Sequence, residues 1–186
     1  MKIYTRKGDR GETALFGGKR IGKDSPRINA YGHVDELNSI LGIVRSLKPR
    51  RDVDNIIQDL QGDLFVLGAD LSTPRQNRQA KVPRIHQSNI TALERTIDLL
   101  EHRLSPLRSF ILPGGTELAA QLHFARTVCR KAERSIVHLS KKEAIGEEIP
   151  SYVNRLSDLL FVLARYANRT SRRKEILWHS RRSAKR

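Results

Sequence analysis

The chain has 186 residues with a formal net charge of +15, and 38% of its residues are hydrophobic but only 5% aromatic. This length allows one domain with a sizeable core, and the single cysteine excludes both an internal disulfide framework and a thiolate zinc site. No segment is typical of a signal peptide or reaches the ~20 apolar residues of a membrane span, so we expect a cytoplasmic protein that does not enter a membrane.

Residues 1–30 are rich in Gly, Lys, Arg and Thr and lack helical periodicity, which predicts a loop. Glycines let backbone N–H groups approach phosphate oxygens, and the neighbouring lysines and arginines supply positive charge. The spacing is not that of a Walker loop, and many loops of this composition bind nothing. The pattern therefore gives a candidate anion-binding loop.

Apolar residues recur at helical spacing in five segments, at residues 34–47, 53–71, 89–104, 116–140 and 151–168. We expect Ser88 or Asn89 to cap the third helix, and Pro150 stands where the first turn of the fifth tolerates proline. No run alternates strongly enough to predict a strand. The sequence therefore predicts an all-α fold, a five-helix bundle with antiparallel neighbours.

In the first of these helices, Asp35 points away from the apolar face, and the small residues Ser39 and Gly42 lie on its side of the helix. Small residues there would let another helix approach closely. A carboxylate at this place can pair with an arginine of a neighbouring chain, or it can be a solvated acid near a helix N-terminus. The spacing does not decide between the two.

In the fourth helix, Arg126, Arg130 and Glu133 are spaced i, i+4 and i+7 and lie within about 60° of one another on the helical wheel. The stripe flanks the apolar face, so we expect both arginines beside the core. Two arginines in line with a carboxylate can grip a triphosphate, each through a bidentate fork. The alternative is a surface ladder of ion pairs, which is common on helices.

The fifth helix carries Asn154 in its first turn, where the amide can reach a nucleotide or make local hydrogen bonds. Asp158, Phe161 and Arg165 continue the same stripe. The six histidines show no pair with metal-ligand spacing, and no Ser/His/Asp order indicates a hydrolase. We therefore predict no metal site formed by a protein motif.

Residues 171–186 are densely basic and lack the interleaved aromatic residues of a single-strand binder. We expect a single domain over residues 1–170, followed by a solvated basic tail, and removal of residues 172–186 should leave activity nearly intact.

Five blocks along the chain resemble the PduO-type ATP:corrinoid adenosyltransferases, in that family's order and spacing from about residue 3 to residue 166. They are Ile3-Tyr4-Thr5-Arg6-Lys7-Gly8-Asp9-Arg10-Gly11 with Leu15-Phe16-Gly17-Gly18, Ala30-Tyr31-Gly32-His33-Val34-Asp35-Glu36-Leu37-Asn38, Phe110-Ile111-Leu112-Pro113-Gly114-Gly115, Ala125-Arg126-Thr127-Val128-Cys129-Arg130-Lys131-Ala132-Glu133-Arg134, and Tyr152-Val153-Asn154-Arg155-Leu156-Ser157-Asp158.

The resemblance implies a homotrimer of five-helix bundles that holds ATP between adjacent subunits, with Mg²⁺ on the ATP phosphates and cobalamin or a related corrinoid as second substrate. It implies that Asp35 pairs across the interface with Arg126, and that Phe110 lines the corrinoid side and helps to displace the lower axial ligand. Arg130 and these three residues are the catalytic set. The implied ATP contacts are Thr5, Arg6, Lys7, Gly8, Thr13, Lys23, Arg130, Glu133, Arg134 and Asn154.

Two departures stand out: Lys7 where the family commonly has threonine, and Lys131 where it has a second arginine. Lys131 points away from the Arg126/Arg130 stripe, so we expect its exchange to be tolerated, whereas Lys7 puts charge in place of a hydroxyl. The implied activity transfers the 5′-deoxyadenosyl group of ATP to cob(I)alamin, with a reductase and an adenosylcobalamin-dependent enzyme as possible partners. Alternatives are a basic helical nucleic-acid-binding module, which the charge alone would explain, and an ATP-binding sensor on the same fold.

Overall fold

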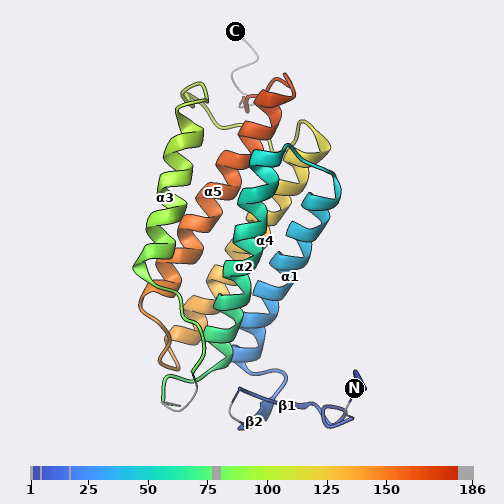
Figure 1. Ribbon diagram of the computed structural model, residues 1–186, viewed down its shortest axis with the longest axis vertical. Helices are drawn as coiled ribbons and strands as arrows, with labels where there is room; N and C mark the ends of the chain where they lie inside the picture. The colour runs from blue at the N-terminus through green and yellow to red at the C-terminus, as the bar shows by residue number, and fades with distance from the viewer. Residues whose placement is uncertain (1, 5, 17, 77–80, 180–186) are drawn as a thin grey trace.

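The computed structural model describes residues 2–4, 6–16, 18–76 and 81–179, and over these ranges the chain forms a helical bundle with a small N-terminal hairpin (Figure 1). The predicted all-α bundle is confirmed. In chain order the elements are β1 (Glu12–Ala14), β2 (Arg20–Gly22), α1 (Pro26–Ser46), α2 (Arg51–Ser72), α3 (Gln87–Glu101), α4 (Glu117–Ser140) and α5 (Glu148–Thr170).

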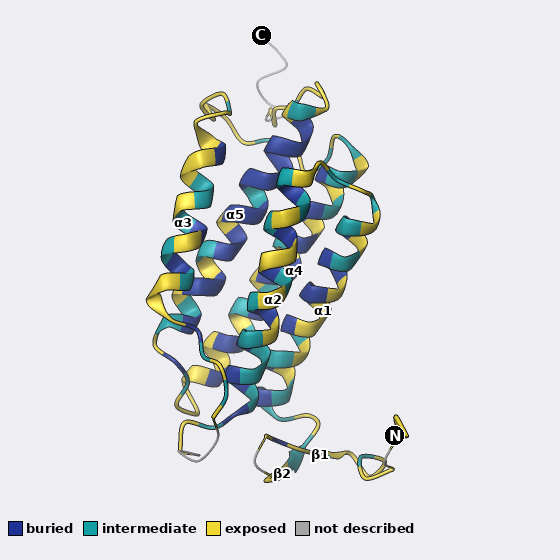
Figure 2. Cartoon of the chain, in the orientation of Figure 1, coloured by how far each residue is buried: buried dark blue, intermediate teal, exposed yellow. Residues whose placement is uncertain are grey.

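Helix α4 lies at the centre of the bundle, packed between α1 and α5, while α2 covers α1 and α3 covers α5. Its apolar stripe is fully buried and consists largely of small side chains, which let the neighbouring helices approach closely. The buried faces of all five helices turn inward, as Figure 2 shows. The stripe residues with no exposed surface are Ala119, Leu122, Ala125, Cys129, Ala132 and Ile136.

The prediction that residues 1–30 form a loop is wrong in two places. Residues 12–14 and 20–22 pair as an antiparallel hairpin in which Thr13 lies opposite Ile21, and strands this short show no alternation that sequence reasoning could detect. Helix α1 begins already at Pro26, because Ser25 accepts a hydrogen bond from the Ile28 N–H at 3.3 Å and proline suits the first turn.

The buried side chain of Arg27 stabilises the first turns of α1, which lie before the apolar stripe that predicts this helix. The side chain of Arg27 is 1% exposed, and its Nε and Nη2 donate to Oε2 of Glu143 at 3.0 and 2.8 Å. Its Nη1 donates to the carbonyl of Leu71 at the end of α2. One guanidinium thus joins α1, α2 and the α4–α5 connection, which satisfies the charge that it buries.

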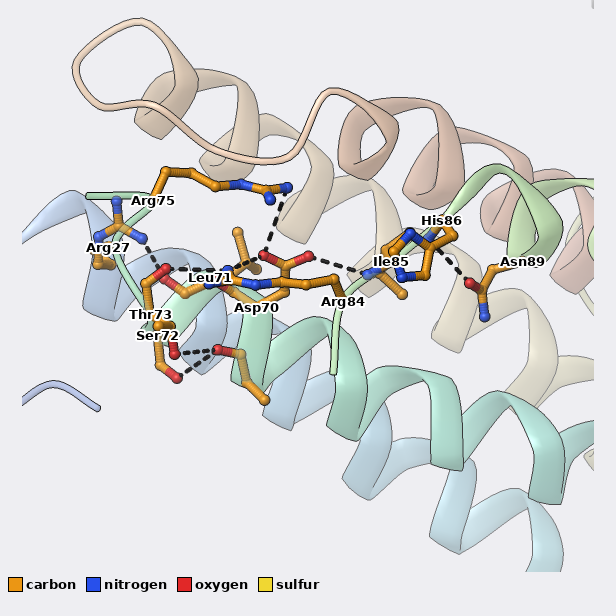
Figure 3. A network of polar contacts seen from close by, with 11 residues as sticks. Arg27, Asp70, Leu71, Ser72, Thr73, Arg75, Arg84, Ile85, His86 and Asn89 are labelled. Atoms are coloured by element: carbon orange, nitrogen blue, oxygen red, sulfur yellow. Dashed lines mark hydrogen bonds and ion pairs between the residues drawn. The ribbon is translucent and has the colours of Figure 1, made fainter. Parts of the chain in front are cut away.

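Asp70, in the last turn of α2, fastens the α2–α3 connection to the same end of the bundle (Figure 3). Its side chain is 1% exposed; Oδ1 accepts a hydrogen bond from Nη1 of Arg84 at 2.6 Å, and Oδ2 accepts one from the Ile85 N–H at 3.1 Å. Arg75 approaches the same carboxylate at 3.9 Å. Because a buried carboxylate is stable only when paired and hydrogen-bonded, this cluster fixes where the chain enters α3.

The start of α3 differs from the prediction, since its N-cap is His86 and neither Ser88 nor Asn89. Asn89 lies within the first turn, where its Oδ1 accepts a hydrogen bond from the His86 N–H at 3.1 Å and its Nδ2 donates to Asp63 at 3.1 Å. The side chain thus links two helices.

The segment just after α5, in the predicted basic tail, is largely exposed, but its backbone is held in a defined course. There the backbone turns back, Ile111 and Leu177 form an antiparallel bridge, and the Leu112 N–H donates to the Ile176 carbonyl at 2.8 Å. Residues 180–186, the end of the predicted tail, lie outside the described residues. Over the part of the chain that is described, no helix has both the length and the apolar character required to cross a bilayer.

We predict that Asp70→Asn lowers the free energy of unfolding by about 3 kcal/mol, because Arg84 and the Ile85 N–H lose a charged acceptor in a buried place. Denaturant unfolding at one fixed protein concentration measures the change. Asp59→Asn, at an exposed position of the same helix, is the matched control and should change stability by less than about 0.5 kcal/mol. Equal losses in the two variants would contradict a structural role for the Asp70 cluster.

Candidate functional site

Arg126, on α4, carries an unsatisfied donor. Its Nε is buried and has no hydrogen-bond partner among the described residues, although a buried guanidinium normally finds an acceptor. Burial, and then the neighbouring positive charge of Arg130, lower the pKa of Arg126. The Arg126 Nε is therefore available to an acceptor from outside the described residues.

One turn further along α4, Arg130 belongs to a chain of contacts that crosses to α5. Its Nη1 lies 3.8 Å from Oε2 of Glu133, and Oε1 of Glu133 accepts a hydrogen bond from Nδ2 of Asn154 at 3.0 Å. Arg134 donates from Nη1 to the backbone carbonyl of Arg130 at 3.0 Å. The structure thus brings together the four helix-borne residues that were predicted to contact ATP.

The prediction that both arginines flank the core holds for Arg126 only. The side chain of Arg130 is 51% exposed, and Arg134 is exposed as well. The reason lies in the helix geometry, since Arg130 follows the buried Cys129 on the outward side of α4. An exposed guanidinium held by a carboxylate can still turn its remaining donors toward a ligand.

Arg126 and Arg130 open onto a groove of about 660 Å³ between α3, α4 and α5. Helix α3 lines the other side of the groove with carboxylates. Arg155 of α5 forms ion pairs with Glu94 of α3 at 3.1 Å and with Asp158 of its own helix at 2.8 Å. Arg155 is thereby neutralised, while the donors of Arg126 remain. The groove is lined by Glu94, Ile97, Asp98, Glu101, Arg126, Arg130, Arg155, Ser157, Asp158, Phe161 and Val162.

Lys131 stands apart from this stripe, as predicted. Its Nζ binds Oε2 of Glu36 at 2.6 Å and so links α4 to α1 on another side of the helix. The lysine found here in place of arginine therefore does not alter the donors that face the groove.

The predicted ATP contacts of the N-terminal segment gather in and around the hairpin. The Lys23 N–H donates to the Gly11 carbonyl at 2.8 Å, and a Cβ atom on Gly8 would lie 3.3 Å from Nζ of Lys23. Glycine at position 8 therefore leaves room for the ammonium group beside the backbone. Thr13 is half-buried in β1.

The beginning of this segment is stabilised by charge and aromatic contacts. Arg6 lies over the ring of Tyr4 at 5.5 Å, and Arg20 donates from Nη2 to the Lys7 carbonyl at 2.8 Å. Thr5, also predicted to contact ATP, lies outside the described residues. The hairpin extends from the end of the bundle where α1 begins (Figure 1), and the described contacts of Arg6 and Gly8 lie within the segment itself.

Asp35 does not meet Arg126 within one chain. It is exposed on α1 and lines a second groove of about 610 Å³, which the hairpin, α1 and α2 form with the exposed rings of Phe16 and Phe65. Asn38, in the same groove, has a buried Oδ1 without a hydrogen-bond partner among the described residues. The two members of the predicted pair thus lie in different grooves of the molecule.

Phe110 lies just before α4, and its side chain is 79% exposed. Sequence reasoning missed its partner, Trp178, whose ring packs edge-on against it with 6.5 Å between centroids. The signal was present, since Trp178 is the only tryptophan and follows two apolar residues in an otherwise basic segment. It was overlooked because the local charge dominated that stretch.

Among the described residues, no group of three or more His, Cys, Asp and Glu side chains is arranged to hold a metal ion. Cys129 is buried in the core, where burial raises the pKa of its thiol well above the ordinary range. A thiol kept protonated in this way is a poor nucleophile.

The family model for cobalamin adenosyltransferase matches residues 3–167 of this chain. The cobalamin adenosyltransferase of Cupriavidus metallidurans is 46% identical, with 98% of this chain aligned to 97% of that protein. The corrinoid adenosyltransferase PduO of Citrobacter freundii is 41% identical over 95% of this chain.

The chain spans about half the length of the PduO relatives, 53% of the Citrobacter freundii protein and 49% of that from Salmonella typhimurium. Among solved structures, it is similar to a variant of a PduO-type ATP:corrinoid adenosyltransferase from Lactobacillus reuteri complexed with cobalamin and ATP. That structure gives a TM-score of 0.93 at 39% identity and covers 96% of this chain and 100% of the other.

We predict that Arg130→Ala weakens the binding of inorganic triphosphate by about tenfold, the cost of one charge-assisted hydrogen bond. Titration calorimetry on the folded protein measures the dissociation constant. Lys131→Ala is the matched control, because it removes the same charge from the next position but on another face, and we expect a change below about twofold. Equal weakening by both variants would mean that overall positive charge binds the anion.

Proposed function

The chain belongs to the cobalamin adenosyltransferase family, and from this premise we propose that it transfers the 5′-deoxyadenosyl group of ATP to the cobalt of cob(I)alamin. The products are adenosylcobalamin and triphosphate. The observation that carries the proposal is the α4–α5 cluster, in which Arg126 has an unsatisfied buried donor beside an Arg130 held by Glu133 and Asn154. The similar proteins support the transferase, and they support neither a nucleic-acid-binding module nor an ATP sensor.

The proposed reaction requires no covalent bond to the protein. Cob(I)alamin is the nucleophile: a Co–C5′ bond forms as the C5′–O bond of ATP breaks, and triphosphate leaves with the bonding electron pair. The protein needs no nucleophilic side chain of its own, which agrees with a buried, protonated Cys129. Its work is to position the two substrates and to stabilise the charge of the leaving group.

The arginines of α4 are proposed to bind the phosphates. Arg130 turns its outward donors to them, while Glu133, itself held by Asn154, fixes the guanidinium orientation. The proposed ATP contacts of the N-terminal segment are Thr5, Arg6, Lys7, Gly8, Thr13 and Lys23, with Arg134 joining them from α4.

Mg²⁺ is proposed to enter with ATP, on the phosphate oxygens. This ion keeps several waters and takes one or two carboxylates beside substrate phosphates, and Glu133, 20% exposed beside Arg130, is a carboxylate at the right place. The residues present thus fit a nucleotide-borne ion, which would neutralise phosphate charge when bound.

We propose that two chains build each site, within a homotrimer. Asp35 is exposed in one groove, and in another the Arg126 Nε has no acceptor among the described residues, so a neighbouring chain's Asp35 would supply the missing carboxylate. The same arrangement would bring the N-terminal segment of one chain to the α4–α5 cluster of the next. A charge pair that forms only on assembly stabilises the interface and the site together.

Phe110 is proposed to line the corrinoid side of the site. Cobalt(II) is easier to reduce to cobalt(I) once its lower axial ligand has left, and an apolar wall favours that state by excluding water and the ligand. The exposed ring of Phe110 can form such a wall. A reductase would supply the electron and an adenosylcobalamin-dependent enzyme would use the product, in the cytoplasm.

We predict that the protein converts reduced cobalamin and ATP to adenosylcobalamin and releases one intact triphosphate per turnover. The visible spectrum of the corrinoid, recorded with and without protein under a reductant, follows the first product, and phosphorus NMR identifies the second. Release of ADP and phosphate without a new cobalt–carbon bond would instead indicate a nucleotide hydrolase.

We predict that Asp35→Arg and Arg126→Asp each weaken the trimer and reduce activity at least about tenfold, because each places two like charges at the shared interface. The double variant restores opposite charges in exchanged positions and should recover much of the assembly. Sedimentation velocity measures the oligomeric state. A stable monomer that keeps full activity would refute the shared site.

A further inference from the structure

Residues 174–178, here called the C-terminal strap, run antiparallel to the segment that carries Phe110. The Trp178 N–H donates to the Phe110 carbonyl at 2.8 Å, and the Leu112 N–H donates to the Ile176 carbonyl at 2.8 Å. Ile111 and Leu177 form the bridge between these two bonds. Two backbone hydrogen bonds therefore hold the strap against residues 110–112.

A buried arginine anchors both sides of the pairing. Arg165 of α5 is 6% exposed; its Nε binds Oε1 of Glu175 in the strap at 3.0 Å, and its Nη2 donates to the Ser105 carbonyl at 2.8 Å. Since a buried guanidinium requires its acceptors, this residue holds the strap and the chain before Phe110 in one geometry.

The other end of the Phe110 segment is fixed by Asn168, also on α5. Its Nδ2 donates to the Gly114 carbonyl and its Oδ1 accepts from the Thr116 N–H, both at 2.9 Å. Gly115 has a φ of +112°, and the Asn168 side chain occupies the space where a Cβ atom on Gly115 would lie, so glycine is required there. The backbone of the segment is thus held from both ends.

Among the described residues, the aromatic contact of the Phe110 side chain comes from the strap. It is 79% exposed, and the ring contact described for it is the edge-on packing of Trp178, with 79° between the ring planes. An exposed phenylalanine without such a neighbour samples several rotamers. The Trp178 ring restricts that choice, because an edge-to-face pair has a preferred geometry.

We propose that Trp178 is a positioning residue for the adenosyl transfer, which holds the Phe110 ring in the orientation that lines the corrinoid. The inference rests on the proposed function, because it gives Phe110 the role assigned there. A wall that excludes the lower axial ligand works only if it is already in place when the corrinoid arrives. The strap holds the Phe110 ring in place before the corrinoid arrives, and it is not part of the ATP-binding cluster.

A double-mutant cycle tests the coupling. Trp178→Ala should slow cobalamin adenosylation by about three- to tenfold, the scale of one aromatic pair, and leave the KM for ATP unchanged. In a Phe110→Ala background the same change should have no further effect, because the residue that it positions is gone. Trp178→Phe keeps an aromatic edge and should restore most of the rate.

Two further readouts separate positioning from a general loss of structure. Electron paramagnetic resonance of cob(II)alamin bound with ATP should show less of the four-coordinate form in Trp178→Ala than in wild type. Since Trp178 is the only tryptophan, its fluorescence should change in Phe110→Ala before any substrate is added. Contrary to the expectation for the tail from sequence, removing residues 174–186 should lower activity at least as much as Trp178→Ala, because it also removes the Glu175 acceptor of Arg165. Removing only residues 180–186 leaves the contacts of residues 174–178 in place and should not lower activity.

Two results would overturn this inference. One is that the rate losses of Trp178→Ala and Phe110→Ala multiply in the double variant. The other is that Trp178→Ala shows the same four-coordinate fraction of cob(II)alamin as an active wild type. If the wild type forms no adenosylcobalamin at all, the proposed function fails and this inference fails with it. The two failures are therefore distinguishable by wild-type turnover.

Discussion

The position of α4 between α1 and α5 decides where the charged residues of the site can lie. The stripe that contains Ala125, Cys129 and Ala132 has no exposed surface, so it must face its two neighbours. A helix buried on that stripe has only its flanks for charge. Arg126 is partly buried and has an unsatisfied Nε donor. Arg130, one turn further along α4, is more exposed and forms an ion pair with Glu133.

The two halves of the proposed ATP site therefore lie apart within one chain. The helix-borne half has Arg130 beside Glu133 and an Arg126 Nε that no described residue accepts from. The N-terminal half has Gly8 and Lys23 in the hairpin segment beyond the start of α1. Ion pairs of the buried Arg27 and Asp70 side chains connect the helices and loops at the end of the bundle that carries the hairpin. Assembly of identical chains is an economical way to join such halves, since one interface repeats around the axis.

Sequence reasoning predicted the five helices because their apolar stripes are long and regular. It missed the hairpin and the first turns of α1, where pairing and the buried Arg27 stabilise structure without a local apolar pattern. Of the site, the helical wheel placed Arg126, Arg130 and Glu133 on one side of α4, and the structure added the Asn154 hydrogen bond that joins Glu133 to α5. Trp178 could not be placed, because its contact with Phe110 depends on a chain reversal after α5 that no spacing encodes.

The shared site is tested most directly by mixing two variants that damage different halves, Lys23→Ala and Arg130→Ala, after dissociation and reassembly. If each site takes one half from each of two chains, random reassembly of an equal mixture leaves about a quarter of all interfaces with an intact site, unmixed trimers included. Adenosylcobalamin formation then returns to roughly that fraction of the wild-type rate. If each site lay within a single chain, every site in the mixture would still carry one defect. Activity in the mixture no higher than the mean of the two separate variants would therefore contradict the account.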